Sequence, residues 1–167
     1  MSKPERTARS QYLTKVREDF PDTLVLGDDT FVKKFPMRYG ENPGYPAAFY
    51  QETGAEGPNM GRLEILQEGT KGLSYINVGD MDLGQRLARK LVQVFPGRQA
   101  CVIIKHEMPS GVALGDDPVG SFEKAWKCDS LSNFGGVDVF SYRVTEPLAR
   151  LLVESPRNVE VVYAPDF

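Results

Sequence analysis

The sequence predicts an α/β fold in which helices cover a largely parallel sheet. An unbroken apolar run over residues 100–104 is typical of a buried strand. From residue 73 onward, strand-like and helix-like patterns alternate along the chain, and alternating elements of this kind normally form a helix-covered parallel sheet. With 167 residues, the chain can bury the core of one ordinary domain.

The first third of the chain is expected to contain a helix followed by short strands and loops. Residues 5–19 carry apolar side chains at helical spacing among charged ones, which predicts an N-terminal amphipathic helix. Residues 23–37 mix short apolar runs with a Gly-Asp-Asp turn and are expected to be strand or loop. Residues 38–44 have the composition of a loop, and residues 47–50 are expected to form a short strand.

A long helix should precede the apolar strand. Asp80 or Asp82 can cap this helix, and Pro96-Gly97 should end it. After the strand, Pro109-Ser110-Gly111 has turn composition, and the turn is expected to continue to Gly115.

The last third of the chain has clear helix starts. Asp117 and Pro118 suit the N-cap and first position of a helix that runs through Trp126. Residues 137–144 are expected to form a strand. Thr145-Glu146-Pro147 should open another helix through Val153, and residues 159–163 should form a final strand.

Composition limits the classes of function. The net charge of −3, from 20 basic and 23 acidic residues, gives no global electrostatic reason to bind nucleic acid or an anionic membrane. Cys101 and Cys128 form neither a CxxC pair nor a disulfide framework, which suits a reducing compartment, so a cytoplasmic location is expected. No segment has the length and apolarity of a signal peptide core or a membrane span.

The strongest chemical signal is Lys105-His106, where the only histidine of the chain follows the apolar strand. Histidine titrates near neutrality, and an adjacent ammonium disfavours imidazolium, which keeps the imidazole available as a base. Lysine can hold an anion or a developing oxyanion. The alternative is a solvated strand-end lysine beside a histidine that only caps a turn.

Three loop segments can contact a ligand, and each also has a structural interpretation. The segment 38–43 combines Arg38 and Tyr39, which suits a phosphate or carboxylate, although a segment of this kind taken alone is more often a surface loop. Asn77 can hold a heterocycle or cap a helix. The glycines of segment 131–136 permit close approach of a ligand or form a tight turn.

Other chemistries find little support in the sequence. The His-x-Glu and Pro-Cys-x-x-Cys pattern of zinc deaminases is absent, as are the glycine-rich nucleotide loops and the Gly-x-Ser-x-Gly nucleophile elbow. Neither a catalytic metal nor a covalent mechanism is therefore expected.

Five motifs occur in order along the chain and together resemble one enzyme family. They are Arg38-Tyr39-Gly40-Glu41-Asn42-Pro43, Leu73-Ser74-Tyr75-Ile76-Asn77, Cys101-Val102-Ile103-Ile104-Lys105-His106, Ser132-Asn133-Phe134-Gly135-Gly136 and Val159-Glu160-Val161-Val162-Tyr163-Ala164-Pro165. Over about residues 31–167, the chain is similar to the formyltransferase region of the bifunctional AICAR transformylase/IMP cyclohydrolase family.

The resemblance implies a three-layer, cytidine-deaminase-like sheet covered by helices, with residues 1–30 as an N-terminal helix and linker. Residues 31–167 would be the first of the family's two similar subdomains. The second subdomain carries much of the folate pocket, and the family's active sites lie at a homodimer interface. A homodimer or a second-half chain is therefore the expected partner. Because the chain stops soon after its last strand, a partner segment or a truncation is expected.

The implied reaction is formyl transfer from 10-formyltetrahydrofolate to the 5-amino group of AICAR, which gives FAICAR in de novo purine biosynthesis. His106 would move the proton of the attacking amine, and Lys105 would steady the formyl oxygen or the leaving folate nitrogen. The remaining implied contacts are Arg38 and Tyr39 with the nucleotide, Asn77, Gly135 and Glu160 around its heterocycle, and Leu131 and Phe134 on the folate side.

The chain departs from the family at the catalytic turn. The family usually has Lys-His-Ala-Asn-Pro-Cys-Gly, whereas this chain has Glu107, Met108 and Ser110 at the first, second and fourth positions after the histidine. A carboxylate beside His106 favours imidazolium and can blunt a base. The alternative function is therefore a non-catalytic purine-ribotide-binding or assembly module. A generic α/β domain with chance motifs is the third interpretation.

Overall fold

The computed structural model describes residues 19–69 and 71–167, which form two compact units, residues 19–76 and residues 77–167. The helix expected over residues 5–19 lies almost wholly outside the described residues. Each unit is built on its own sheet, and helices flank the larger sheet, so the α/β fold class is confirmed.

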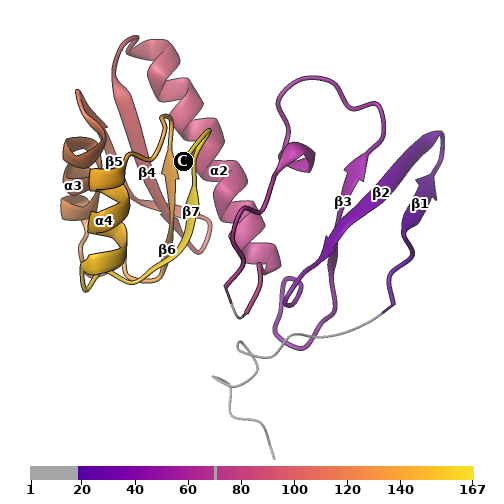
Figure 1. The fold of residues 1–167 in the computed structure, drawn as a ribbon. Helices are drawn as coiled ribbons and strands as arrows, with labels where there is room; N and C mark the ends of the chain where they lie inside the picture. Colours follow the sequence, from indigo (N-terminus) through magenta and orange to yellow (C-terminus); the bar gives the residue numbers. More distant parts are fainter. Residues whose placement is uncertain (1–18, 70) are drawn as a thin grey trace, which may run out of the picture. The chain divides into compact units, whose positions relative to one another are not determined.

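The first unit is an antiparallel meander (Figure 1). Its elements are β1 (Thr23–Leu26), β2 (Asp29–Pro36), β3 (Ala48–Glu52) and the 3-10 helix η1 (Met60–Arg62). Gly27 has a φ of 64° in the turn between β1 and β2, a conformation that glycine adopts without steric cost. The rings of Phe35 and Phe49 stack at 5.2 Å across β2 and β3.

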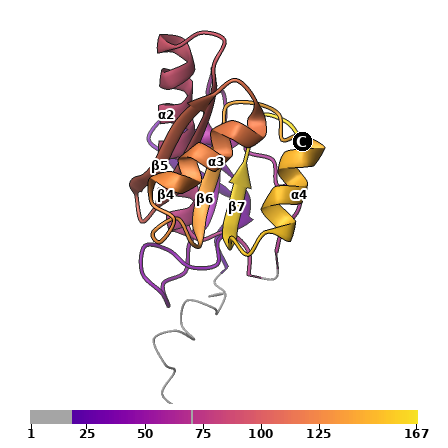
Figure 2. The same ribbon diagram turned by 90° about the vertical axis from the view of Figure 1, so that its left-hand side faces the viewer.

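The second unit is a four-stranded sheet between two helical layers. It contains α2 (Tyr75–Val94, of which residues 77–94 belong to this unit), β4 (Gln99–Lys105), β5 (Met108–Gly115), α3 (Pro118–Cys128), β6 (Gly136–Phe140), α4 (Glu146–Glu154) and β7 (Val159–Tyr163). The strand order is β5-β4-β6-β7. α2 covers one face, and α3 and α4 cover the other (Figures 1 and 2).

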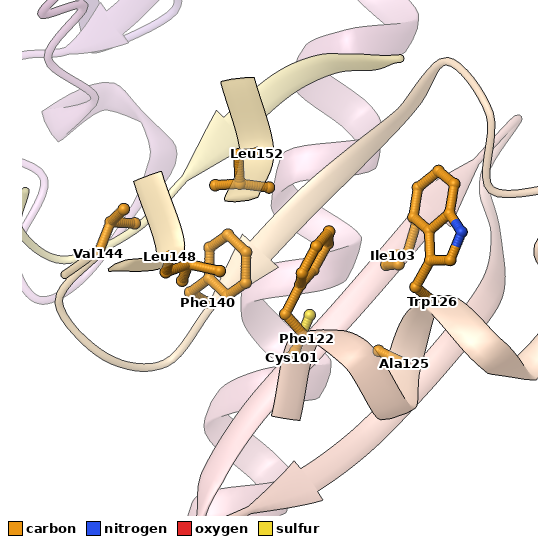
Figure 3. Packing of buried hydrophobic residues seen from close by; sticks show 9 residues of the cluster. All are labelled: Cys101, Ile103, Phe122, Ala125, Trp126, Phe140, Val144, Leu148 and Leu152. Atoms are coloured by element: carbon orange, nitrogen blue, oxygen red, sulfur yellow. The ribbon is translucent and has the colours of Figure 1, made fainter. Parts of the chain in front are cut away.

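Alternation along the central strands divides the core between these layers. Cys101 and Ile103 of β4 face the layer of α3 and α4, where they join a buried cluster with Phe122, Ala125, Trp126, Phe140, Val144, Leu148 and Leu152 (Figure 3). Val139 and Ile104 face α2, since a side chain added at Gly84 of that helix would meet both. A strand buried on both faces has no polar positions, which explains the unbroken apolar run.

The prediction of a largely parallel sheet is wrong. β4 pairs antiparallel with both β5 and β6, and only β6 and β7 are parallel. The sequence predicts a turn over residues 109–115, whereas these residues belong to β5, which forms a hairpin with β4. Pro109 is tolerated there because β5 is an edge strand with an irregular register.

Most helix starts follow the sequence signals. Asp117 caps α3 by accepting a hydrogen bond from the Gly120 N–H at 2.7 Å, with Pro118 as the first helical residue. Thr145 holds the N-cap position of α4. The prediction that Asp80 or Asp82 caps the preceding helix is wrong, because α2 begins at Tyr75 and contains both residues.

Two strand predictions have different outcomes. The strand predicted at residues 159–163 matches β7. The strand predicted at 137–144 ends at Phe140, because the chain bends over the next residues before α4.

Asp138 of β6 is an acidic residue in the apolar interior. Its side chain is 1% exposed, and within the described part of the chain neither carboxyl oxygen has a hydrogen-bond partner. Burial raises the pKa of Asp138 to about 8, although the nearby Arg157 guanidinium acts in the opposite direction. The carboxyl is therefore protonated at neutral pH in the folded protein.

This protonation makes the stability of the fold depend on pH. The unfolded chain releases the Asp138 proton near pH 4, whereas the folded chain keeps it to about pH 8. The stability that comes from tighter proton binding in the folded state is fully present below the unfolded pKa. It is lost as the pH rises through the folded pKa. We expect the free energy of unfolding of the wild type to fall by about 2 kcal/mol relative to Asp138→Asn between pH 6 and pH 8. Urea denaturation of both proteins at several pH values measures this difference, and parallel pH profiles would contradict it.

Candidate functional site

The turn that joins β4 to β5 carries the predicted catalytic pair. Lys105 is the last residue of β4 and is paired with Met108, so only His106 and Glu107 form the turn. Their φ angles are 52° and 60°, and positive φ at both central residues is what a type I′ turn requires. Residues with a Cβ pay roughly 1–2 kcal/mol each for this left-handed conformation. Both side chains are exposed, so the imidazole is accessible.

A carboxylate from α2 bonds to the backbone of this turn. Oδ1 of Asp80 accepts a hydrogen bond from the Glu107 N–H at 2.8 Å, and Asp80 is only 3% exposed. Burial raises the pKa of Asp80, while the Glu107 N–H and the charge on His106 act to lower it. The turn is thus tied to a buried side chain of the neighbouring helix.

Lys105 is oriented by a second loop. Its Nζ donates a hydrogen bond to the backbone oxygen of Phe134, which lies between α3 and β6. Asn133 anchors that loop: its buried Nδ2 donates to the oxygens of Trp126 at 2.9 Å and Ala125 at 3.3 Å. The ammonium is therefore held at the strand end by a fixed carbonyl.

The predicted folate-side residues lie on the same loop. Leu131 is 90% exposed and Phe134 is 55% exposed, which leaves two apolar side chains in solvent on the loop that Lys105 contacts. Gly135 has a φ of 71° and donates its N–H to the oxygen of Asn158 at 2.6 Å. Glu160, two residues further along, is an exposed residue of β7.

Asn77 and Asp80 project from the same side of α2. Asn77 is the third residue of the helix and is buried, so it does not hold the N-cap position. Residues three apart on a helix are neighbours on its surface. The ligand-binding interpretation of Asn77 stays a prediction.

Arg38 and Tyr39 belong to the first unit, whereas the other predicted site residues belong to the second. Both are buried. The backbone N–H of Arg38 donates to the carbonyl oxygen of Leu73 at 2.7 Å. The backbone N–H of Tyr75 donates to the carbonyl oxygen of Tyr39 at 3.1 Å. The guanidinium carbon of Arg38 lies 5.0 Å from the centre of the Tyr39 ring, within the range of a cation–π contact. The loop is therefore more ordered than its composition suggests.

The structure thus brings Lys105 to the Phe134 backbone and His106 to Asp80. The contact between Asp80 and the turn was not predicted, because the sequence suggested a helix cap at Asp80. The available signal was the three-residue spacing from Asn77, which places both side chains on one face of a helix.

Comparison with known proteins identifies the family. A profile of the AICARFT/IMPCHase bienzyme family matches residues 6–167. The chain belongs to this family. It is 36% identical over 152 residues to the bifunctional purine biosynthesis protein PurH of Clostridium acetobutylicum and 37% identical to PurH of Clostridium botulinum strain Hall. Each alignment covers 91% of this chain and 28% of the relative, so the chain spans less than a third of these PurH proteins.

The names of these relatives place them in purine biosynthesis. Among the described residues, no helix combines the length and apolarity that crossing a bilayer requires.

The loop between α3 and β6 should depend on Asn133. We expect Asn133→Ala to lower the free energy of unfolding by about 2 kcal/mol, because buried backbone carbonyls at the end of α3 lose their donor. Urea denaturation measures the change. The control is Ser130→Ala at an exposed position of the same loop, which should change stability by less than about 0.5 kcal/mol. Equal effects of the two substitutions would contradict the anchoring role.

Proposed function

We propose that this chain is part of the formyltransferase half of its bifunctional family. Residues 31–167 would form the first deaminase-like subdomain of an AICAR transformylase. The proposed activity is phosphoribosylaminoimidazolecarboxamide formyltransferase, with 10-formyltetrahydrofolate as cosubstrate and AICAR as acceptor. The product, FAICAR, serves de novo IMP biosynthesis in the cytoplasm.

The transfer exchanges one carbon–nitrogen bond for another. The 5-amino nitrogen of AICAR attacks the formyl carbon, and the bond between that carbon and N10 of the folate breaks. The amine proton passes to the His106 imidazole and ends on N10 of tetrahydrofolate. The weakly nucleophilic amine needs a base close by, and the formyl oxygen needs a cationic partner while it carries negative charge.

The observation that carries the proposal is the arrangement at the end of β4. The Lys105 ammonium leaves the last residue of β4, and the exposed His106 imidazole leaves the next residue, in the turn. The ammonium is held against the Phe134 carbonyl, beside exposed apolar side chains that suit a folate ring. His106 would transfer the proton, and Lys105 would stabilise the oxyanion or the leaving nitrogen.

The remaining site residues are assigned to the two ligands. Arg38 and Tyr39 would bind the nucleotide, and Leu131 and Phe134 would contact the folate. Asn77, Gly135 and Glu160 would surround the heterocycle. A homodimer or a second-half chain would complete the folate pocket, and no catalytic metal is needed for this reaction.

A second candidate is a purine-ribotide-binding or assembly module without turnover. Glu107 favours this candidate, because the family usually has alanine directly after the catalytic histidine, whereas this chain has a carboxylate there. Calorimetry with AICAR separates both candidates from a generic α/β domain, which would not bind it. Binding without turnover, in the presence of 10-formyltetrahydrofolate and a second-half chain, would favour the module.

His106→Ala should abolish formyl transfer, since no other histidine exists to replace the base. We expect a fall in kcat of at least about 100-fold, which is typical of losing a general base. The assay follows tetrahydrofolate release by the chain with a second-half chain, AICAR and 10-formyltetrahydrofolate. Full activity in the variant would refute the assigned role.

Lys105→Met should lower kcat about 100-fold if the ammonium stabilises the oxyanion. The matched control is Lys90→Met, which removes an exposed lysine from α2 and should leave kcat unchanged. Equal activity of the two variants would contradict the proposed role of Lys105.

A further inference from the structure

The turn of His106 and Glu107 has a conformation that its own residues do not favour. The positive φ angles at both positions are typical of Asn-Gly, not of residues with long side chains. The catalytic pair proposed above would thus depend on a strained segment. Such a segment persists only where surrounding structure holds it.

The holding contact comes from α2. Asp80 accepts the Glu107 N–H at 2.8 Å, and the His106 backbone N–H also acts on the same carboxyl. Asp80 is buried within the second unit, on a helix that packs closely on β4 and β6 at Gly84. Its side chain therefore has little freedom to follow the turn if the turn moves.

A role in starting the helix does not explain Asp80. It is the sixth residue of α2, beyond the first turn where a carboxylate caps free N–H groups. It accepts a hydrogen bond from the hairpin, a segment 27 residues away in the sequence. The contact thus links helix and turn.

We propose that Asp80 is a positioning residue that fixes the β4–β5 turn and thereby the directions in which Lys105 and His106 leave the strand. This inference rests on the formyl transfer proposed above and adds a residue that touches neither ligand. Fixed directions matter because a misplacement of about 1 Å at a reacting group can cost about 100-fold in rate.

The first test observes the turn without any reaction. The chain without a histidine tag has a single imidazole, so one set of ring signals in an NMR spectrum reports on His106. In Asp80→Ala, we expect the Glu107 amide proton to exchange at least about tenfold faster and the His106 ring signals to shift. Asp80→Asn, which keeps an acceptor oxygen in the same place, should retain most of the protection. Asp82→Asn on the same helix is the control and should match the wild type.

The second test measures kinetics in the formyl-transfer assay described above. Asp80→Ala should lower kcat about 10–100-fold and change the KM for AICAR less than about threefold, because orientation and not binding is lost. Adding Glu107→Gly should restore most of kcat, since glycine adopts positive φ without a clamp. Glu107→Gly alone is the reference with which the kcat of the double variant is compared. A merely structural role for Asp80 predicts no such rescue.

The outcomes separate this inference from the proposed function. Unchanged amide exchange and ring signals in Asp80→Ala would overturn the clamp. A loosened turn with unchanged kcat would overturn the positioning role. A wild-type chain that holds the turn but transfers no formyl group would refute the proposed function, while faster amide exchange in Asp80→Ala would still support the clamp.

Discussion

The second unit depends on the close approach of helices to both faces of its sheet. On one face, a Cβ added at Gly84 of α2 would lie 2.6 Å from a methyl group of Val139. On the other, a Cβ added at Gly111 of β5 would lie 2.3 Å from the backbone oxygen of Ala125 in α3. Neither distance is compatible with a side chain, so glycine sets the spacing between layers.

This spacing determines where the functional groups lie. α2 is close enough to the sheet for the short Asp80 side chain to reach the Glu107 N–H. α3 is close enough for Asn133, just beyond its end, to bond the last helical carbonyls and hold the loop that receives Lys105. The strand end therefore meets a helix side chain on one side and an anchored loop on the other.

Local signals in the sequence predicted much of this architecture. Asp117-Pro118 and Thr145 mark helix starts by hydrogen bonding and fixed φ, which need no distant partner. β4 and β7 were predicted at nearly their observed bounds, because apolar runs reflect burial directly.

β5 was missed because its start has turn composition. Proline, serine and glycine at residues 109–111 are turn formers, whereas the true turn consists of His106 and Glu107, which have no such preference. The contact with Asp80 is 27 residues distant in sequence, so no local pattern could have moved the predicted turn.

In the candidate site, the positions of the catalytic residues were predictable, whereas their contacts were not. Lys105 and His106 lie at the strand end as expected, because the end of an apolar run locates them. The acceptor for Lys105 is the backbone oxygen of Phe134, and a carbonyl that every residue carries leaves no signature in the sequence. Helix packing and loop anchoring supply this contact.

The second unit contains two buried carboxyls with different surroundings. Asp138, between the sheet and the layer of α3 and α4, has no hydrogen-bond donor within the described residues, and burial keeps it protonated near neutral pH. Asp80 is also buried, but backbone N–H groups of the turn partly offset the cost of its charge. A donor-free carboxyl adds only a desolvation cost to the fold.

A buried carboxyl that accepts hydrogen bonds from backbone N–H groups can also fix the backbone to which those groups belong. The geometry at Asp80 is of this second kind, since the strained turn contributes the donor and the buried helix contributes the acceptor. The energy that stabilises the carboxylate is then the same energy that maintains positive φ at His106 and Glu107. In the proposed clamp, one hydrogen bond therefore both partners the buried Asp80 carboxyl and holds the turn that carries His106.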